Sequence, residues 1–294
     1  MAMCNPVGRA NYQPNSWGMG PREHPQKGFR SFADAEEGQK VRLRAESFAD
    51  HYSQARQFFI SQTLTEQKHI AMALTFELSK VETSAIRERV VSHLLNIDAG
   101  LAETVAEKLG MKDLPKKADA AVEPRDDLPA SDALSIVKNG PESFKGRKVG
   151  VLVSDGCDGA LVKKLEAALT KEGAMMEIVA PKVGGVEAAD GSLIEGKQMI
   201  NGGPSVLYDA VALIVSPEGA EQLTKEAAAL DFVADAFVHC KFIAHVEAAQ
   251  PLLDKAGVEP DEGVMPLGST SDISDFIKSC RKLRLWAREM KVKL

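Results

Sequence analysis

A polar segment with several prolines near the middle of the chain limits what the sequence can fold into. Residues 112–144 hold four prolines among Lys, Asp, Glu and Ala, with almost no bulky apolar side chain before Leu134. Proline interrupts helices and sheets, and a core needs apolar side chains, so this segment is predicted to be a linker. Residues 47–111 and 145–294 are therefore expected to be separate folding units, connected rather than packed together.

The first 46 residues are predicted to form an irregular, extended arm. Prolines and glycines interrupt any helical or strand pattern, yet four aromatic residues are interspersed: Tyr12, Trp17, Phe29 and Phe32. A free linker rarely carries so many aromatic side chains. We expect the arm to fold against something larger, either another subunit or a further domain.

Helical signals follow the arm. Thr63 and Glu66 have the spacing of a capping box, which predicts a helix over Glu66–Lys80. A second helix is expected after Thr83 and a third over Leu101–Leu109. This segment has few bulky apolar residues for its length, so we expect it to dock on a partner surface.

After Gly146 the pattern alternates between strands and helices. Ser216 and Pro217 provide an N-cap followed by a proline at the first helical position. The region Glu187–Ile200 is expected to form a hairpin. Strands are predicted at Val149–Val153, Met176–Val179, Ala210–Val215 and Phe242–Val246, and helices at Ala160–Lys171, Glu218–Phe237, Ala248–Ala256 and Asp272–Met290. This order favours right-handed crossovers and an α/β fold with a doubly wound parallel sheet.

Charge and cysteine usage exclude several classes of partner. The formal net charge of −6 disfavours binding to nucleic acid or to an anionic membrane. The four cysteines include no C-x-x-C pair, which fits neither a disulfide framework nor a structural zinc site. No signal-peptide pattern or run of eighteen apolar residues is present, so we expect a cytoplasmic protein.

Several segments of the N-terminal half resemble the large-subunit class of monofunctional haem catalases. The resemblance covers about residues 9–110, the end of the haem domain and the helical segment. It rests on Asn11-Tyr-Gln-Pro-Asn-Ser-Trp17, Phe48-Ala-Asp-His-Tyr-Ser-Gln-Ala-Arg56, Ser61-Gln-Thr63, Phe76-Glu-Leu-Ser-Lys-Val81, Ile86-Arg-Glu-Arg-Val90 and Leu95-Asn-Ile-Asp98. In that class a linker and an extra flavodoxin-like domain follow, similar to PfpI-like class I amidotransferases, which is the order expected here.

The resemblance implies the decomposition of hydrogen peroxide to water and oxygen, an oxidoreductase reaction of the oxidative stress response. Such catalases use a distal histidine, a distal asparagine and a tyrosinate that ligates haem iron. The tyrosine lies in an R-x-x-x-Y motif, whereas Tyr12, Tyr52 and Tyr208 all lack an arginine four residues earlier. We therefore expect no catalytic residue and no bound haem in this chain alone, although the intact family carries haem.

The PfpI-like resemblance also implies a pocket that has lost its chemistry. In that family a cysteine occupies a tight turn between a strand and a helix, and Glu247 stands at the matching position. A carboxylate cannot replace a thiolate nucleophile. Asp155 and Asp158 follow the first strand: Asp158 is interpreted as a helix N-cap, and the alternative is a functional carboxylate paired with Glu247. Together with His245 these residues form the candidate vestigial pocket.

Cys240 and His239 are neighbours at the start of the fourth predicted strand. Neighbouring side chains in a strand point to opposite faces, so we interpret Cys240 as a buried structural thiol rather than half of a Cys–His pair. His239 and His245 would share a face, but no third ligand accompanies them, and no metal site is expected. The basic face of the last predicted helix is interpreted as a solvated surface.

The sequence thus predicts a stabilising and assembly module of a haem catalase, in a homo-oligomer or bound to a catalase haem domain. A free-standing chaperone-like protein of the PfpI family is the alternative. A PfpI-type hydrolase or glyoxalase is disfavoured by Glu247.

The aromatic content of the arm predicts self-association of the chain. Light scattering at micromolar concentration is expected to give an oligomer, and deletion of residues 1–40 is expected to shift it toward the monomer. A monomer that is unchanged by the deletion would contradict this prediction.

Overall fold

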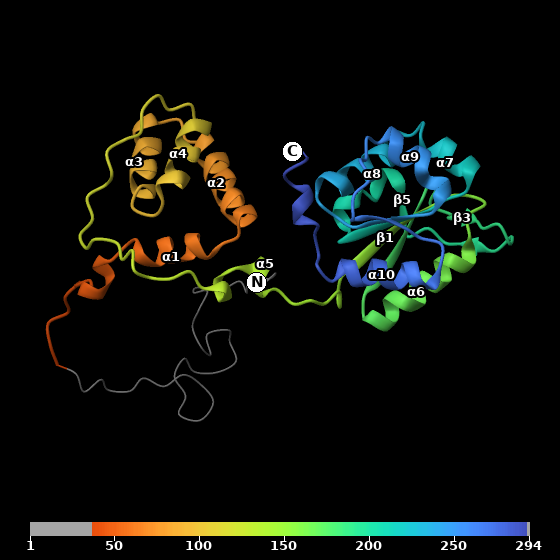
Figure 1. The fold of residues 1–294 in the computed structure, drawn as a ribbon, viewed down its shortest axis with the longest axis horizontal. Helices are drawn as coiled ribbons and strands as arrows, with labels where there is room; N and C mark the ends of the chain where they lie inside the picture. The colour runs from red at the N-terminus through yellow and green to blue at the C-terminus, as the bar shows by residue number, and fades with distance from the viewer. Residues whose placement is uncertain (1–36, 293–294) are drawn as a thin grey trace, which may run out of the picture. The chain divides into compact units, whose positions relative to one another are not determined.

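A computed structural model describes residues 37–292 (Figure 1). The chain divides into two compact units, residues 1–49 and 50–294. Most of the predicted arm, with its aromatic residues and Cys4, lies outside the described residues. The described part of the first unit contains one 3-10 helix, Glu46–Ala49, with no buried residue.

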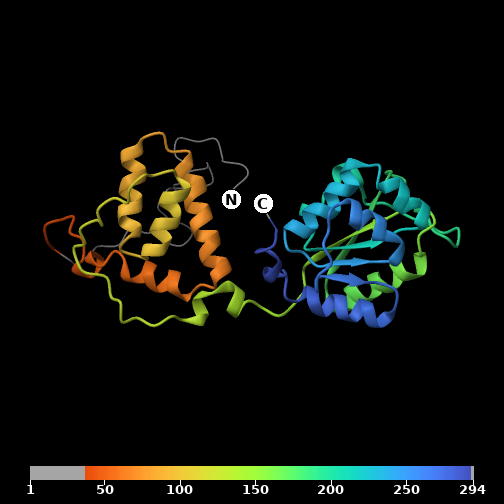
Figure 2. The same ribbon diagram turned by 45° about the horizontal axis from the view of Figure 1, so that its top comes forward.

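Four helices form the segment that follows: α1 Ser53–Ser61, α2 Leu64–Ser79, α3 Ser84–Leu94 and α4 Ala99–Lys108 (Figure 2). The predicted capping box is confirmed: Thr63 Oγ1 accepts a hydrogen bond from the Glu66 amide, and the Glu66 carboxylate accepts one from the Thr63 amide. Asp98 caps α4 in a similar way. A small core of its own lies between the helices, centred on Val91, Ala102 and Val105, which are inaccessible to solvent.

The predicted linker is hydrogen-bonded to this helical segment. The amides of Arg125 and Ser131 donate to Ser53 Oγ and Ser61 Oγ, at 2.8 and 2.9 Å. Beyond them, η2 Asp132–Leu134 and α5 Ile136–Asn139 reach Glu66, whose carboxylate accepts from Ser135 Oγ at 2.7 Å and from the Val137 amide at 3.0 Å. The sequence predicted a linker without naming contacts for it; two hydroxyls and one carboxylate on α1 and α2 supply partners for its polar groups. We call residues 125–137 the strap.

A six-stranded parallel sheet forms the core of residues 145–292, so the predicted α/β class is confirmed. The strand order is β5-β2-β1-β6-β7-β8, and its five main strands have the flavodoxin-like order. Their bounds are β1 Lys148–Val153, β2 Met175–Ala180, β5 Gln198–Met199, β6 Ala210–Ile214, β7 Ile243–His245 and β8 Val264–Pro266.

Helices cover both faces of this sheet (Figure 1). The helices α6 Gly159–Glu172 and α10 Thr270–Cys280 lie on one face. On the other lie α7 Pro217–Leu223, α8 Ala227–Val238 and α9 Gln250–Lys255. The central strands are therefore mostly apolar, because successive side chains enter opposite cores.

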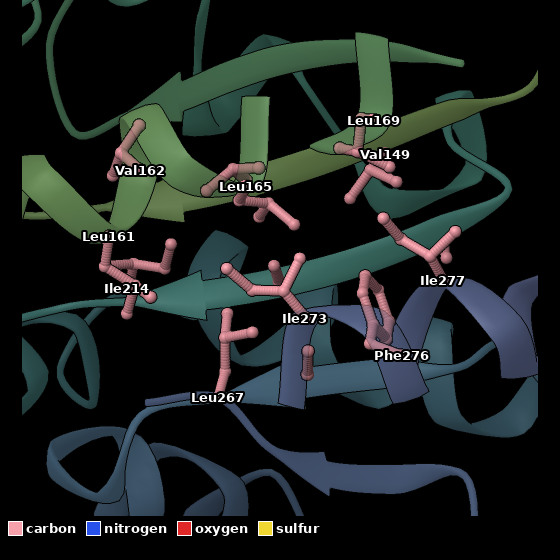
Figure 3. Packing of buried hydrophobic residues seen from close by; sticks show 14 of the residues in the cluster. Val149, Leu161, Val162, Leu165, Leu169, Ile214, Leu267, Ile273, Phe276 and Ile277 are labelled. Atoms are coloured by element: carbon pink, nitrogen blue, oxygen red, sulfur yellow. The ribbon is translucent and has the colours of Figure 1, made fainter. Parts of the chain in front are cut away.

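Strand β1 shows this alternation residue by residue. Val149, Val151 and Val153 pack with α6 and α10, as Figure 3 shows for Val149, whereas Leu152 packs against the opposite helices. Gly150 stands where a side chain would enter the second core, and a Cβ there would lie 2.2 Å from the Tyr208 ring. The aromatic ring occupies that space, so the strand needs a glycine at this position.

The hairpin prediction is only partly correct. β3 Val186–Glu187 and β4 Leu193–Ile194 pair as an antiparallel ribbon, but β5 joins the main sheet parallel to β2. β8 was not predicted; it is a three-residue edge strand, where Pro266 is tolerated because edge positions need fewer backbone donors.

The last helix is shorter than predicted. It ends at Cys280 rather than Met290, and Leu283 has a positive φ of 67°. The chain turns because its tail binds elsewhere: the Leu285 amide donates to the Cys240 carbonyl, and the buried Arg288 guanidinium forms two bonds of 2.7 and 2.8 Å with Asp261. Leu283, in the turn after α10, still packs against the core that this helix covers, whereas Met290 is exposed.

Within residues 37–292, no helix has both the length and the apolar composition needed to cross a lipid bilayer.

Substitution Glu66→Gln is expected to release the strap. Burial raises the pKa of Glu66, but hydrogen bonds from Ser135, Thr63 and Val137 outweigh it and lower the pKa to about 2. The Gln side chain keeps one acceptor oxygen, but its NH2 group would face the groups that donate to Glu66 and could not accept from them. We therefore expect a loss of about 1–3 kcal/mol in the free energy of unfolding at pH 7. Faster hydrogen exchange of the Val137 amide is the direct measurement.

The pH dependence gives this prediction its control. Because the folded-state pKa lies below the ordinary value of 4.5, the carboxylate stabilises the fold fully above about pH 4.5 and loses this effect as the pH falls toward 2. The difference between the two proteins should therefore shrink at low pH. Glu77→Gln, which removes an exposed partner of Lys80 on the same helix, should leave the strap unchanged.

Candidate functional site

The carboxyl ends of β1 and β6 form the edge where parallel α/β sheets place ligands. These two neighbouring strands are followed by crossovers to opposite faces of the sheet, and α6 and α7 begin directly beyond them. Such a switch point leaves a crevice in many folds of this class. The candidate site residues Asp155 and Asp158 lie here, as the sequence predicted.

Two buried serines fill the switch point. Ser216 Oγ donates to the Asp155 carbonyl at 2.6 Å and accepts from the Gly219 amide at 3.0 Å. Ser154 Oγ accepts from the Ser216 amide at 2.9 Å. A Cβ at Gly219 would lie 1.9 Å from Ser154 Oγ, so the two segments are in direct contact. The amides that bind a ligand in related architectures are here bonded within the protein.

Asp158 is a helix cap, as the sequence analysis favoured. Its carboxylate accepts from the Leu161 amide at 3.0 Å, which satisfies a free donor at the start of α6. Helix α7 is capped by Ser216, with Pro217 at its first position, as predicted. One amide at the start of each helix, that of Leu161 in α6 and that of Gly219 in α7, is thus bonded to a side chain of the protein itself.

Asp155 is hydrogen-bonded to the β3 segment and is not paired with Glu247. Its carboxylate accepts from the Glu187 amide at 2.9 Å and from Lys182 Nζ at 3.4 Å. The Glu187 bond and Lys182 together hold the pKa of Asp155 below its ordinary value, and its side chain is 62% exposed. A shallow cavity of about 470 Å³ adjoins it, bordered by Lys182, Gly185 and Leu193. This arrangement fixes a loop; it does not present a catalytic carboxylate.

Glu247 lies after β7 but not in a strained elbow. It begins the 3-10 helix Glu247–Ala249, its side chain is exposed, and Val246 before it has an extended backbone with φ −76°. Nucleophile elbows hold the reactive residue in a sharp, strained turn. Among residues 37–292, the only non-glycine residues with positive φ are Cys240 and Leu283. Glu247 therefore lacks both the side chain and the backbone geometry of such a nucleophile.

His245 is the last residue of β7, between Leu213 and Pro266 of the neighbouring strands. Its Nδ1 lies 3.1 Å from the Val246 carbonyl. His239 is not on this strand, contrary to the sequence prediction: it caps the end of α8, and its Nδ1 lies 2.7 Å from the Asp235 carbonyl. The two histidines therefore do not share a strand face. No cluster of three metal-ligating side chains occurs in the described part of the chain.

The three described cysteines are free and buried. Burial raises the pKa of Cys157, of Cys240 and, most strongly, of Cys280, which disfavours the reactive thiolate. Cys240 was placed on a strand by sequence, but it lies in the turn between α8 and β7 with φ 58°. Its backbone carbonyl binds the tail, and its thiol is 3.8 Å from the Val238 carbonyl.

A buried lysine that no sequence pattern had indicated lies beside this turn. Lys241 is 3% exposed, and its Nζ donates to the Ser205 carbonyl. Burial, reinforced by the Arg284 charge, lowers the pKa of Lys241 to about 8. The sequence signal that could have indicated this residue is a lysine placed directly before a buried strand. Its contacts join the loop before β6 to the start of β7, which is a structural role.

Comparison with protein families identifies both parts of the chain. Residues 45–109 match the model described as catalase-related immune-responsive, and residues 145–290 match the C-terminal domain found in long catalases. The chain belongs to the long catalases and corresponds to their C-terminal portion.

Individual long catalases show the same extent of similarity. Catalase C of Rhizobium meliloti (strain 1021) is 60% identical over all of this chain, which is 42% of that protein's length. Catalase HPII of Pseudomonas putida is 36% identical over 96% of the chain and 40% of its own length. Catalase-B of Dictyostelium discoideum is 33% identical over 97% of the chain and 42% of its own length. The chain spans about two fifths of the length of these relatives.

The described tyrosines do not fit the haem of a catalase. Tyr52 Oη lies 2.7 Å from His93 Nδ1, and Tyr208 Oη donates to the Glu177 carboxylate, so both phenols have internal partners. Burial and the Glu177 charge raise the pKa of Tyr208, whereas an iron ligand must be a tyrosinate. Both side chains are almost inaccessible to solvent.

Thiol labelling tests whether the α/β domain holds a nucleophile. In a Cys4→Ser background we expect slow modification of the native protein, and Cys240→Ser should not change it, because the remaining thiols are buried. Glu247→Cys should add one thiol that reacts at least about tenfold faster, since this position is exposed at the start of a helical turn. A fast-reacting thiol that disappears in Cys240→Ser would instead reveal a nucleophile.

Proposed function

We propose that this chain is the stabilising and assembly portion of a haem catalase that decomposes hydrogen peroxide, and that it has no haem site of its own. The two family matches, in the order found in long catalases, carry this proposal. The similarity to Catalase C continues through the strap, which joins the two matched regions. Domain limits at residues 47–111, 112–144 and 145–294 are part of the same proposal.

Exposed apolar side chains on α1 and α2 support an assembly role. Leu64 is 85% exposed and Phe76 62%, and Phe58 and Met72 are each about half exposed. Leu64 and Met72 also border a groove of about 360 Å³ between α2 and α4. Water contact with so many large apolar groups on neighbouring helices is unfavourable, and this favours burial against a further protein surface. A catalase haem domain or another copy of the chain is the proposed partner.

The geometry of the sheet edge supports a structural rather than catalytic role for the α/β domain. The switch point is filled by serines, Asp155 and Asp158 bind backbone amides, and Glu247 lies in an unstrained turn. Hydrolase or glyoxalase chemistry has no assigned nucleophile here. That Glu247, Asp155, Asp158 and His245 are the remains of a lost pocket stays part of this proposal.

A chaperone-like activity is the second candidate, favoured by the same exposed apolar side chains. Binding of unfolded clients needs accessible apolar surface, which α2 provides in this chain. A cytoplasmic location, proposed from the scattered cysteines, agrees with either function.

The purified chain is expected to release no oxygen from hydrogen peroxide and to show no Soret absorbance after incubation with haem. The physical reason is that its described tyrosines are bonded to His93 and Glu177 and cannot act as the iron ligand. Intact Catalase C of Rhizobium meliloti, assayed in the same way, is the positive control.

Oxygen release together with a Soret band would contradict this prediction. The chaperone alternative is distinguished separately, by aggregation of a heat-unfolded client. Suppression that is lost in Leu64→Ser and Phe76→Ser would favour it over the assembly role, whereas no suppression would reject it.

A further inference from the structure

A groove of about 580 Å³ runs along the outer surface between α6 and α10. Both helices cover the same face of the sheet and lie side by side in Figures 1 and 2. Residues from both helices line the groove: Lys164, Ala167, Ala168, Lys171 and Glu172 on α6, and Thr270, Ile273, Ser274, Ile277 and Lys278 on α10, with Arg281 after it.

The floor of the groove is apolar and formed by small or anchored side chains. Ala167 and Ala168 have short side chains, so the backbone of a bound segment can approach α6 closely. Ile273 and Ile277 are held in the core beneath, against α6 and the sheet (Figure 3). The floor is therefore preformed, and binding a partner would not require its rearrangement.

The rim of the groove is positively charged. Within residues 37–292, Lys164, Lys171 and Lys278 have no carboxylate within 4.0 Å, whereas Arg281 is paired with Glu172 through bonds of 2.8 and 2.7 Å. Four cations and one carboxylate leave three uncompensated positive charges. The whole chain carries a net charge of −6, so the residues that line the groove differ in sign from the net charge of the chain.

The positive charges on the rim limit which kind of molecule can bind in the groove. A second copy bound through the same face would bring six like charges together, which opposes a symmetric dimer at this surface. The N-terminus of α10 does not provide an anion site either, because Ser269 and Asp272 already form a capping box there. An apolar floor between rows of cations instead fits a segment with an apolar stripe and acidic flanks.

We propose that this groove binds an acidic amphipathic helix of a partner protein. The partner would place small or aliphatic side chains at spacings of three and four on Ala167 and Ala168, above the buried Ile273 and Ile277, and its Asp and Glu residues beside the three unpaired lysines. Helix α10 has eleven residues, about 16 Å, which matches a partner helix of about three turns. This inference does not depend on the proposed catalase role.

A labelled peptide tests the proposal on the full 294-residue chain. The probe is a fluorescein-labelled helix of about 14 residues, with Leu and Ala on one face and Glu on the flanks, and binding is measured by fluorescence anisotropy. We expect saturable binding that weakens at least about tenfold in the Lys164→Glu/Lys278→Glu double variant. Ala168→Trp, which fills the floor without changing charge, should weaken it to a similar extent.

Matched controls separate groove binding from general charge attraction. Lys163→Glu/Lys282→Glu makes the same charge change at exposed lysines that do not line the groove, and should alter affinity less than about twofold. Circular dichroism confirms that each variant is folded. Equal losses in both double variants, equal binding of a peptide with Lys in place of Glu, or no saturable binding would overturn the proposal. So would preferential binding to vesicles of phosphatidylcholine and phosphatidylserine.

Discussion

Burial of the central parallel strands on both faces is the constraint on which the α/β domain depends. β1 and β6 lie between helices on either side, so their alternate residues enter two separate cores. The buried part of each strand must then be apolar, and each helix must supply a matching apolar face. Gly150 shows how closely the layers fit, since the Tyr208 ring occupies the space its side chain would need. The order of elements, the layers and the position of the sheet edge follow from this burial.

The edge produced by this arrangement has the architecture of a ligand site but not its open donors. In a doubly wound sheet, free amides at the strand ends and helix starts would face the crevice. Here Ser154, Ser216 and Asp158 bind those amides, and Asp155 binds the amide of Glu187. Polar groups that are satisfied within the protein stabilise the fold but leave little to recognise a substrate. Membership of the long catalases therefore tells more about this chain's role than the sheet edge does.

The strap shows how a polar segment gains a fixed path. It has little apolar surface to bury, so its position depends on hydrogen bonds to Ser53, Ser61 and Glu66. Glu66 first caps its own helix and then accepts two further bonds from the strap. One carboxylate thus couples a local signal, readable from four residues of sequence, to a contact with residues about seventy positions later. The first was predictable and the second was not, because nothing local specifies the distant partner.

The sequence by itself determined the α/β class, the helical segment, the caps at Thr63, Asp158 and Ser216, and the family. These depend on short-range patterns: alternating burial, capping spacing and motif similarity. Tertiary structure decided the features that depend on contacts between residues far apart in the sequence. It ended the last helix at Cys280, because the tail binds the Cys240 carbonyl and Arg288 binds Asp261. It made β8 a strand, because only pairing with β7 stabilises three residues there. It also decided the partners of two candidate carboxylates, since Asp155 binds the Glu187 amide and Asp158 binds the Leu161 amide.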